Sequence, residues 1–389
     1  MVVQIDGVNT QNKGAELMLV AILEELEKRV PESTVWINSN SYLRTDLLPN
    51  YRLKIKQRFL SRRSNILKRI LSKFRIINSW SAQFYLINLF TQYYAIKGVD
   101  IMLDASGFQY SDQWNHSLQG LRLRERYYSK LKNNGTKMIM LTQAFGPFES
   151  VNGKKSVQII SKYFDMIFAR EQKSYNYLVD AGANIEIIRK SCDFTFKANG
   201  EGLKSFKSLN GAVCIIPNKK MFTHGHSSKS LYVQFLLNII FLFEEKGKSA
   251  FLLNHEGVGD EEICKEINAL VGNRLTVITG LSAKQVKGVI GQSYLTISSR
   301  FHGVASSLSQ GVPCLATSWN HKYQMLFEDF GQNDRLLNEA EDWKINLKRI
   351  NNVIDNHEAI SSELLSSKQK RLEEIEGMWN AILPKKTGI

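Results

Sequence analysis

Residues 294–317 have the sequence YLTISSRFHGVASSLSQGVPCLAT, in which a strand, a helix and a second strand follow one another closely. The apolar and β-branched residues at 294–298 predict a buried strand, and the small residues at 303–310 predict a helix that packs tightly against it. Gly311-Val-Pro313 ends this helix before the second strand, at 314–317. A helix between two such strands is typical of a βαβ unit, so this stretch predicts a parallel sheet.

The same alternation extends over most of the chain. Strands are predicted at residues 2–5, 35–38, 100–103, 137–141, 166–168 and 185–188, and then at 212–216, 250–253, 275–278, 294–298 and 314–317. The polar stretch KANGEGLKSFKSLN at 197–210 separates the two series and predicts a linker. We therefore expect an α/β protein with two doubly wound parallel-sheet domains, at 1–196 and 211–338, that face each other across a cleft. Residues 339–389 predict C-terminal helices.

Composition excludes several classes of protein. The 389 residues are 43% hydrophobic and 23% charged, which excludes a disordered or fibrous chain. The four cysteines are far apart and form no C-x-x-C pair, which argues against a zinc knuckle, a redox motif or a disulfide framework; they are Cys192, Cys214, Cys264 and Cys314. The N-terminal sequence MVVQIDGVNTQNKG lacks the features of a signal peptide. We expect a cytoplasmic protein.

The net charge of +14 comes mostly from one segment. Residues 52–76, RLKIKQRFLSRRSNILKRILSKFRI, contain ten Lys or Arg and no acid, with apolar residues at helical spacing from 66 to 74. This pattern predicts a basic amphipathic insertion in the N-terminal domain. The helix either lies on an anionic membrane surface, with Arg62, Arg63, Lys68 and Arg69 at the headgroups, or packs on its own domain. It lacks the interleaved aromatics of a nucleic-acid platform, so we expect no nucleic-acid partner.

Ligands of doubly wound sheets bind beyond the carboxyl ends of the strands, so polar residues directly after a strand are candidates for a site. Four clusters in the predicted N-terminal domain satisfy this rule. Their notable members are Asn12 with Gly14 and Glu16, Asp104 with Ser106 and Gly107, Gln143 with Gly146, and Arg170 with Glu171. Taken alone, the first cluster is better explained as a capped turn before a helix, because one Gly without G-x-G-x-x-G or a Walker A pattern is a weak signal. The arginine of the last cluster either pairs with its neighbouring glutamate or binds a ligand.

The strongest cluster follows the strand at 294–298. Arg300, Phe301 and His302 stand where the strand ends and the next helix begins, and Lys322 follows the strand at 314–317. A guanidinium group binds a carboxylate or phosphate with two parallel hydrogen bonds, and the helix N-terminus adds to the attraction for an anion. The imidazole both donates and accepts a proton near neutral pH. The alternative is structural: His302 caps the helix and Arg300 pairs with a carboxylate.

Taken together, these motifs resemble the polysaccharide pyruvyl transferase family. The resemblance rests on N-x-G-A-E at 12–16, the G-P turn at 146–147, A-R-E at 169–171 and, above all, SSRFHGVASSLSQGVPCLATSWNHKY at 298–323. It implies a GT-B-like fold of two Rossmann-like domains and an enzyme that moves the pyruvyl group of phosphoenolpyruvate onto two hydroxyls of a sugar. The products are a cyclic ketal and phosphate. By position, the family's phosphoenolpyruvate-binding residues correspond to Arg170, Arg300, Phe301, His302 and Lys322.

The chain departs from the family pattern at two places, where Ser106-Gly107 replaces a common G-G-G turn and Glu16 replaces a common Asp. Both lie on the acceptor side, for which the candidates are Asn12, Glu16, Asp104 and Gln143. Asp6 is a further carboxylate that would orient or deprotonate the sugar hydroxyls. Neither departure removes a cation, so the donor side is unaffected.

The chemistry of phosphoenolpyruvate agrees with these residues. Its carboxylate and phosphate require at least two cationic forks, which Arg170 and Arg300 supply, and no metal or further cofactor. We hypothesise that one sugar hydroxyl adds to C2 while His302 protonates C3, after which phosphate departs and the second hydroxyl closes the ketal. His302 and Arg300 are therefore the predicted catalytic residues.

Two other functions remain open from the sequence. One is a GT-B glycosyltransferase that uses a nucleotide sugar, because a fold does not fix a function. The other is a non-catalytic scaffold on the membrane surface, in exopolysaccharide or capsule assembly. If the basic helix binds a bilayer, the glycan acceptor would be linked to a polyprenyl diphosphate at the inner face of the plasma membrane. His224, His226 and His255 are interpreted as loop residues and not as metal ligands.

Overall fold

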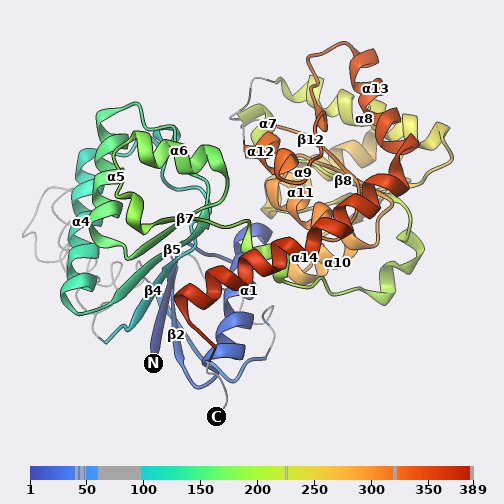
Figure 1. Ribbon diagram of the computed structural model, residues 1–389. Coiled ribbons are helices and arrows are strands. Elements are labelled where there is room, and N and C mark those ends of the chain that lie inside the picture. The colour runs from blue at the N-terminus through green and yellow to red at the C-terminus, as the bar shows by residue number, and fades with distance from the viewer. Residues whose placement is uncertain are drawn as a thin grey trace, which may run out of the picture. The chain divides into compact units, whose positions relative to one another are not determined.

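The computed structural model describes residues 1–39, 43, 48, 50–59, 98–223, 225, 227–318 and 322–385. The chain divides into two compact units (Figure 1). Unit 1 comprises residues 1–10, 18–192 and 378–389, and unit 2 comprises residues 11–17 and 193–377. Each unit therefore includes a short piece of chain from a distant part of the sequence. The predicted C-terminal helical segment contributes to both units.

Unit 1 is built on a seven-stranded parallel sheet in the order β3-β2-β1-β4-β5-β6-β7. Its strands are β1 (Val2–Asp6), β2 (Thr34–Ser39), β3 (Lys54–Phe59), β4 (Ile101–Asp104), β5 (Lys137–Gln143), β6 (Met166–Ala169) and β7 (Ile188–Lys190). The helices are α1 (Lys13–Arg29), whose first turn belongs to unit 2, α4 (Leu118–Asn133), α5 (Val151–Tyr163) and α6 (Gln172–Asp180), with short 3-10 helices η2 (Asp112–Trp114) and η3 (Ile185–Ile187).

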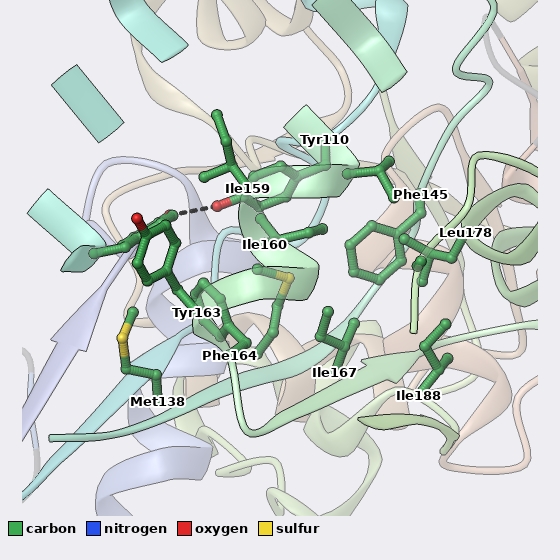
Figure 2. Close-up of a cluster of buried hydrophobic side chains, with 14 of the residues drawn as sticks. Tyr110, Met138, Phe145, Ile159, Ile160, Tyr163, Phe164, Ile167, Leu178 and Ile188 are labelled. Carbon is green, nitrogen blue, oxygen red and sulfur yellow. Dashed lines mark hydrogen bonds between the residues drawn. The ribbon is translucent and has the colours of Figure 1, made fainter. Parts of the chain in front are cut away.

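The core of unit 1 explains why its central strands are apolar almost throughout. Helices α4 and α5 bury apolar side chains in one core together with those of β5 and β6, and Figure 2 shows Ile160, Tyr163, Met138 and Ile167 among its members. The hydroxyl of Tyr110 is satisfied inside this core by that of Tyr128, at 2.5 Å. Strands covered by helices on both faces do not need polar side chains toward solvent. They therefore appear in the sequence as continuous apolar runs, from which they were predicted.

Unit 2 repeats the architecture with a six-stranded parallel sheet in the order β10-β9-β8-β11-β12-β13. Its strands are β8 (Val213–Ile216), β9 (Ala250–Leu253), β10 (Thr276–Ile278), β11 (Leu295–Ser298), β12 (Cys314–Thr317) and β13 (Leu336–Leu337). Its helices are η4 (Phe194–Lys197), η5 (Lys204–Leu209), α7 (Lys220–Thr223), α8 (Lys229–Glu245), α9 (Gly257–Leu270), α10 (Ala283–Gly291), α11 (Phe301–Leu308), α12 (Lys322–Asp329), α13 (Trp343–Asp355) and α14 (His357–Ile382), which ends in unit 1.

Both sheets have the strand order of a doubly wound fold, and this order places the candidate sites. The direction of winding reverses between β1 and β4 in unit 1 and between β8 and β11 in unit 2. Ligands of such sheets bind beyond the carboxyl ends of the strands at this reversal. In unit 1 the last residues of the two strands, Asp6 and Asp104, are register partners. In unit 2 the strand ends lead into Asn218 and Arg300.

The structure corrects parts of the predicted pattern. The start of the basic insertion at 52–76 contains a strand that was not predicted, because Lys54–Phe59 forms β3 at the edge of the sheet. Exposed lysines are common on edge strands, where they discourage pairing with another chain, and Lys56 also lies 5.1 Å from the ring of Trp36. Residues Arg62, Arg63, Lys68 and Arg69 lie outside the described residues. The predicted linker at 197–210 contains the 3-10 helix η5, and residues 185–187 form η3, so the predicted strand begins only at Ile188.

The remaining helical predictions agree with the structure. The apolar stretch at 231–243 forms most of α8, and its apolar side chains are mainly buried in unit 2. The region after residue 339 is helical in α13 and α14. Within the described part of the chain, every helix is too short or too polar to cross a bilayer.

Candidate functional site

The segment from Ser298 to His302 is held in a fixed turn between β11 and α11. The hydroxyl of Ser298 accepts a hydrogen bond from the backbone N–H of Arg300 at 3.1 Å and donates to its carbonyl at 2.9 Å. Gly303 lets the first turn of α11 lie against the strand, because a β-carbon there would be 2.4 Å from the Ser298 hydroxyl oxygen. The turn therefore presents Arg300 and His302 at the carboxyl end of β11.

A buried hydrogen-bond network fixes Ser299, the residue before Arg300. The hydroxyl of Ser299 bonds to those of Tyr232, at 2.6 Å, and Thr317, at 2.5 Å. Its carbonyl accepts from the side chains of Asn218 and Tyr323, at 2.7 and 2.8 Å. These partners come from helices α8 and α12, strand β12 and the loop after β8. The backbone at the strand end is thus anchored on several sides, as a preorganised site requires.

The guanidinium group of Arg300 is engaged by two carboxylates. Its Nε and Nη2 both donate to Asp260, each at 2.7 Å, in a bidentate pair, and its Nη1 forms an ion pair with Glu256. Asp260 also accepts a hydrogen bond from the backbone N–H of Lys219, at 3.0 Å. Burial lowers the pKa of Arg300 to about 10. This value is still far enough above 7 for the side chain to be charged near neutral pH. The structural alternative for Arg300, pairing with a carboxylate, is therefore what the structure contains.

The ring of His302 lies between two residues: Gly14 is on the side of Nδ1 and Asp193 is on the side of Nε2. A β-carbon on Gly14 would lie 2.1 Å from Nδ1, and Nε2 is 4.0 Å from Oδ2 of Asp193. The other oxygen of Asp193 accepts from the N–H and hydroxyl of Thr195, so this buried carboxylate has a fixed position. A carboxylate beside an imidazole favours its protonated form. The close neighbour of Gly14 is thus a side chain of unit 2 itself, His302.

The loop after β9 brings further groups to the same region of unit 2. Asn12 and Glu256 form an antiparallel bridge, and the N–H of Lys13 donates to the carbonyl of His255 at 3.4 Å. Burial, followed by the charges of Arg300, His302 and Lys13, holds the pKa of His255 well below its usual value. His255 is therefore neutral at physiological pH.

Phe301 and Lys322 stand beside the arginine and histidine. The Phe301 ring is buried and packs edge-to-face on His302, with ring centres 5.3 Å apart, and on Tyr323 at 5.9 Å. The ammonium of Lys322 lies 5.3 Å from the centre of the Phe301 ring. Four of the five predicted donor residues thus belong to one cluster in unit 2.

Arg170, the fifth, lies in unit 1 at the end of β6. Its Nε is 3.5 Å from the carboxylate of Glu171, and its backbone N–H donates to the carbonyl of Gln143 at 3.1 Å. The side chain of Arg170 is nearly buried. The pairing with Glu171 that the sequence suggested is therefore present.

The four predicted acceptor-side residues divide between the units. Asn12 and Glu16 belong to unit 2, where the Asn12 side chain accepts from the N–H of Gly14, at 2.8 Å, and so caps α1. Glu16 is fully buried, and one of its oxygens accepts from the N–H of Ala283 at the start of α10 while the other pairs with Lys13. Asn12 therefore makes the helix-capping contact that the alternative interpretation described, whereas Glu16 accepts from the first residue of another helix, α10.

Asp104 and Gln143 lie in unit 1 with Asp6 at the reversal of the sheet. Asp104 accepts from the N–H and hydroxyl of Ser106 and, more distantly, from the amide of Gln143 at 3.5 Å. Asp6 accepts from the hydroxyl of Tyr127 at 2.6 Å. Burial, opposed by its hydrogen bonds and assisted by the charge of Asp104, raises the pKa of Asp6 to about 6. A carboxyl group of this kind changes its protonation state near neutral pH, as a general base must.

Sequence reasoning missed the carboxylates that surround the arginine and histidine. Glu256 and Asp260 follow β9, and Asp193 follows β7, so a survey of acidic residues after every predicted strand would have found all three. Tyr127 carried no such signal, because it lies in the middle of helix α4 and reaches Asp6 only in the folded chain. His224 and His226, together with Asn320 and His321, lie outside the described residues.

Comparison with known proteins identifies both a family and a fold. The model of the family described as polysaccharide pyruvyl transferase matches residues 12–321. The curated proteins give no significant match. Among solved structures, MnaA from S. aureus with UDP has a TM-score of 0.59 at 11% identity, covering 100% of this chain and 98% of that one.

Other similar structures come from different organisms. Anabaena HepE in complex with UDP and glucose has a TM-score of 0.58 at 12% identity, covering 98% of each chain. A putative UDP-N-acetylglucosamine 2-epimerase from Listeria monocytogenes has a TM-score of 0.56 at 12% identity, covering 94% of this chain and 90% of that one. Likeness at such low identity concerns the fold alone. Together with the two parallel sheets, it confirms the predicted GT-B-like α/β class.

Proposed function

The chain belongs to the polysaccharide pyruvyl transferase family, and we propose that it transfers the pyruvyl group of phosphoenolpyruvate onto two hydroxyls of a sugar, in a polysaccharide or its lipid-linked repeat unit, with release of phosphate. One observation carries the proposal. Arg300, Phe301 and His302 lie at the carboxyl end of β11, next to the reversal of the unit 2 sheet, within the residues that the family model matches. This is where a doubly wound sheet binds its ligand.

Donor binding is assigned to the cationic groups of this cluster. Arg300 and Lys322 would hold one anionic group of phosphoenolpyruvate, and the ring of Phe301 contacts Lys322 and His302 and so supports these two side chains. Arg170 would supply a second guanidinium, an assignment that rests on the family resemblance. A substrate with both a carboxylate and a phosphate needs two such groups.

His302 is the proposed proton donor. One sugar hydroxyl loses its proton to a base and forms a bond to C2 of phosphoenolpyruvate, while the C2–C3 double bond breaks and the imidazolium gives its proton to C3. The C2–O bond to phosphate then breaks, and the second hydroxyl attacks the resulting oxocarbenium ion and loses its proton. Asp193 would stabilise the charged imidazole before the transfer, because its buried oxygen is 4.0 Å from Nε2.

The acceptor hydroxyls would meet the carboxylates of unit 1. Asp6 is the better candidate for the general base, since its pKa of about 6 allows it to accept a proton near neutral pH. Asp104 and Gln143 would orient the sugar. Asn12 and Glu16 would act on the acceptor side indirectly, through the first turn of α1 that they fix.

A second candidate function uses a nucleotide sugar as donor. It is favoured by the solved structures of similar fold that contain UDP, namely those of MnaA and HepE. The two candidates differ in the ligand of unit 2, which would be a small dianion in one case and a nucleoside diphosphate in the other. They are therefore separable by direct binding measurements.

The acceptor and the cellular place of the reaction are proposals of their own. We propose a polyprenyl-diphosphate-linked repeat of an exopolysaccharide or capsule, modified at the inner face of the plasma membrane, with the basic residues at 62–69 on the anionic surface. The protein and a variant with Arg62, Arg63, Lys68 and Arg69 replaced by Gln are compared for co-sedimentation with anionic liposomes. Equal sedimentation of the two proteins would contradict the membrane contact.

The proposed reaction is tested by product formation. The purified protein is incubated with phosphoenolpyruvate and a panel of glycans, and mass spectrometry is used to detect a gain of one pyruvyl ketal while phosphate release is measured. We expect a ketal on at least one glycan, formed about 10²- to 10⁴-fold more slowly with His302→Gln. Phosphate release without any ketal, unchanged in the variant, would contradict the assignment.

A further inference from the structure

The two carboxylates on Arg300 differ in how firmly they are held. Asp260 is buried, with 1% of its side chain exposed, and it takes the Nε and Nη2 edge of the guanidinium. Glu256 takes only Nη1, and 27% of its side chain is exposed. One guanidinium therefore has a buried bidentate partner and a second partner that reaches solvent.

Asp260 is a permanent partner. Besides its two bonds to Arg300, its Oδ1 accepts the backbone N–H of Lys219 at 3.0 Å. If this carboxylate left, a buried guanidinium would lose its main countercharge, which is strongly unfavourable. Asp260 thus positions the arginine, with Nη1 directed toward Glu256.

Glu256 is the partner that an incoming anion would displace. It precedes α9 without making a side-chain capping hydrogen bond, so no second contact of this kind holds its carboxylate. Its side chain is 27% exposed, although the oxygen on Nη1 is itself buried, so the carboxylate reaches water by turning away from the guanidinium. If it stayed, a donor anion would meet one cation already opposed by two carboxylates. If it leaves, the anion meets the Arg300–Asp260 pair with Nη1 available.

We infer that Glu256 occupies the place on Arg300 that an anionic group of phosphoenolpyruvate takes, and that it leaves when the donor binds. The inference rests on the proposed function. Glu256 then sets the affinity of the site: anions that cannot replace a carboxylate on Nη1 are rejected, and the donor binds more weakly than the cations alone would allow.

The other charged groups near Nη1 do not take over this role. Lys220, whose pKa is lowered by burial and by the charge of Arg300, and Lys13, which pairs with Glu16, are cations and so do not compete with an anion for Nη1. His255 is neutral, because burial holds its pKa well below the usual value. Glu256 is thus the exposed carboxylate whose removal should strengthen anion binding, an effect opposite in sign to that expected for a merely structural contact.

The test measures the Kd of phosphoenolpyruvate by isothermal titration with the full chain, Glu256→Gln and Glu262→Gln. Glu262 is exposed on α9, the helix that Glu256 precedes, so its variant loses the same charge at another position. Removing a like charge from the binding position should lower the Kd by about three- to ten-fold in Glu256→Gln, while Glu262→Gln stays within about two-fold of the parent.

The outcomes separate this inference from the function on which it rests. If the parent binds phosphoenolpyruvate and Glu256→Gln binds it equally or more weakly, the displacement is wrong while the proposed donor stands. An equal gain in both variants would show a general charge effect and would also overturn the inference. If none of the proteins binds phosphoenolpyruvate, the proposed donor itself is wrong.

Discussion

Gly14 and His302 are in direct contact: the backbone of the first turn of α1 lies so close to the imidazole that a β-carbon on Gly14 would be 2.1 Å from Nδ1. Real β-carbons do not approach other atoms this closely. The glycine in the N-x-G-A-E element and the histidine in the R-F-H element are therefore parts of one arrangement, although 288 positions separate 14 from 302 in the sequence.

Gly14→Ala should reduce turnover by displacing the imidazole while leaving donor binding largely intact. The backbone of α1 is fixed by Asn12 and Glu16, so the ring must move. We expect kcat to fall by roughly 10²-fold, as for the loss of a well-placed acid–base group. Steady-state kinetics and direct titration with phosphoenolpyruvate measure the two effects. Gly377→Ala is the control, since a β-carbon there meets nothing within 4 Å; equal activity of both variants would refute the contact.

His302→Gln should separate catalysis from binding. Gln keeps hydrogen-bonding capacity but carries no transferable proton, so kcat should fall by about 10²- to 10⁴-fold while the Kd of phosphoenolpyruvate changes little. The measurement compares kcat with Kd from titration. Proportional losses in both would recast His302 as a binding residue.

Asp260→Asn should destabilise the protein through Arg300. The substitution leaves a buried guanidinium without its bidentate carboxylate, and breaking a buried pair in this way costs about 3 kcal/mol. Urea denaturation followed by circular dichroism gives the change in stability, with the exposed Asp355→Asn as control. Equal unfolding midpoints would show that the pair contributes little.

Stability should depend on pH through His255. Its pKa is well below 6.5 in the folded protein and near the ordinary value in the unfolded chain, so the unfolded state binds more protons as the pH falls below about 6.5. His255 therefore contributes a decrease in the free energy of unfolding between pH 7 and pH 5, which opposes the contribution of Asp6 and Asp260, whose raised pKa values of about 6 and about 7 let the folded state take up protons in this range. His255→Gln removes only the first contribution, so its free energy of unfolding at pH 5, relative to pH 7, should be higher than that of the parent. An unchanged slope would mean that His255 is not buried neutral.

Much of the fold was predictable because the sheets are parallel and covered by helices. Strands such as Ile101–Asp104 are buried on both faces and show as apolar runs bounded by polar turns. The edge strand Lys54–Phe59 was missed for the opposite reason, since its exposed lysines hide the alternation within a basic segment. The high content of basic residues in this segment concealed the alternation of a strand, in which side chains point to opposite faces with a period of two.

The site was predictable only in part. Arg300 and His302 follow a strand directly, so their place was visible in the sequence. Their partners Asp260 and Asp193 come from other elements of unit 2, and which carboxylate meets which cation depends on the packing of α9 and η4. Pairing of this kind has no local pattern, because it is set by strand order and not by spacing along the chain.

The central claim, that unit 2 binds phosphoenolpyruvate at the Arg-Phe-His segment, is tested most directly by thermal-shift titration of the protein and of Arg300→Ala, each against its own baseline. The ligands are phosphoenolpyruvate and, separately, UDP-, GDP- and CMP-sugars. We predict a concentration-dependent rise in Tm with phosphoenolpyruvate alone, absent in the variant, since a ligand at ~100 times its Kd stabilises by ~2.7 kcal/mol. Stabilisation by a nucleotide sugar, with none by phosphoenolpyruvate, would contradict the claim.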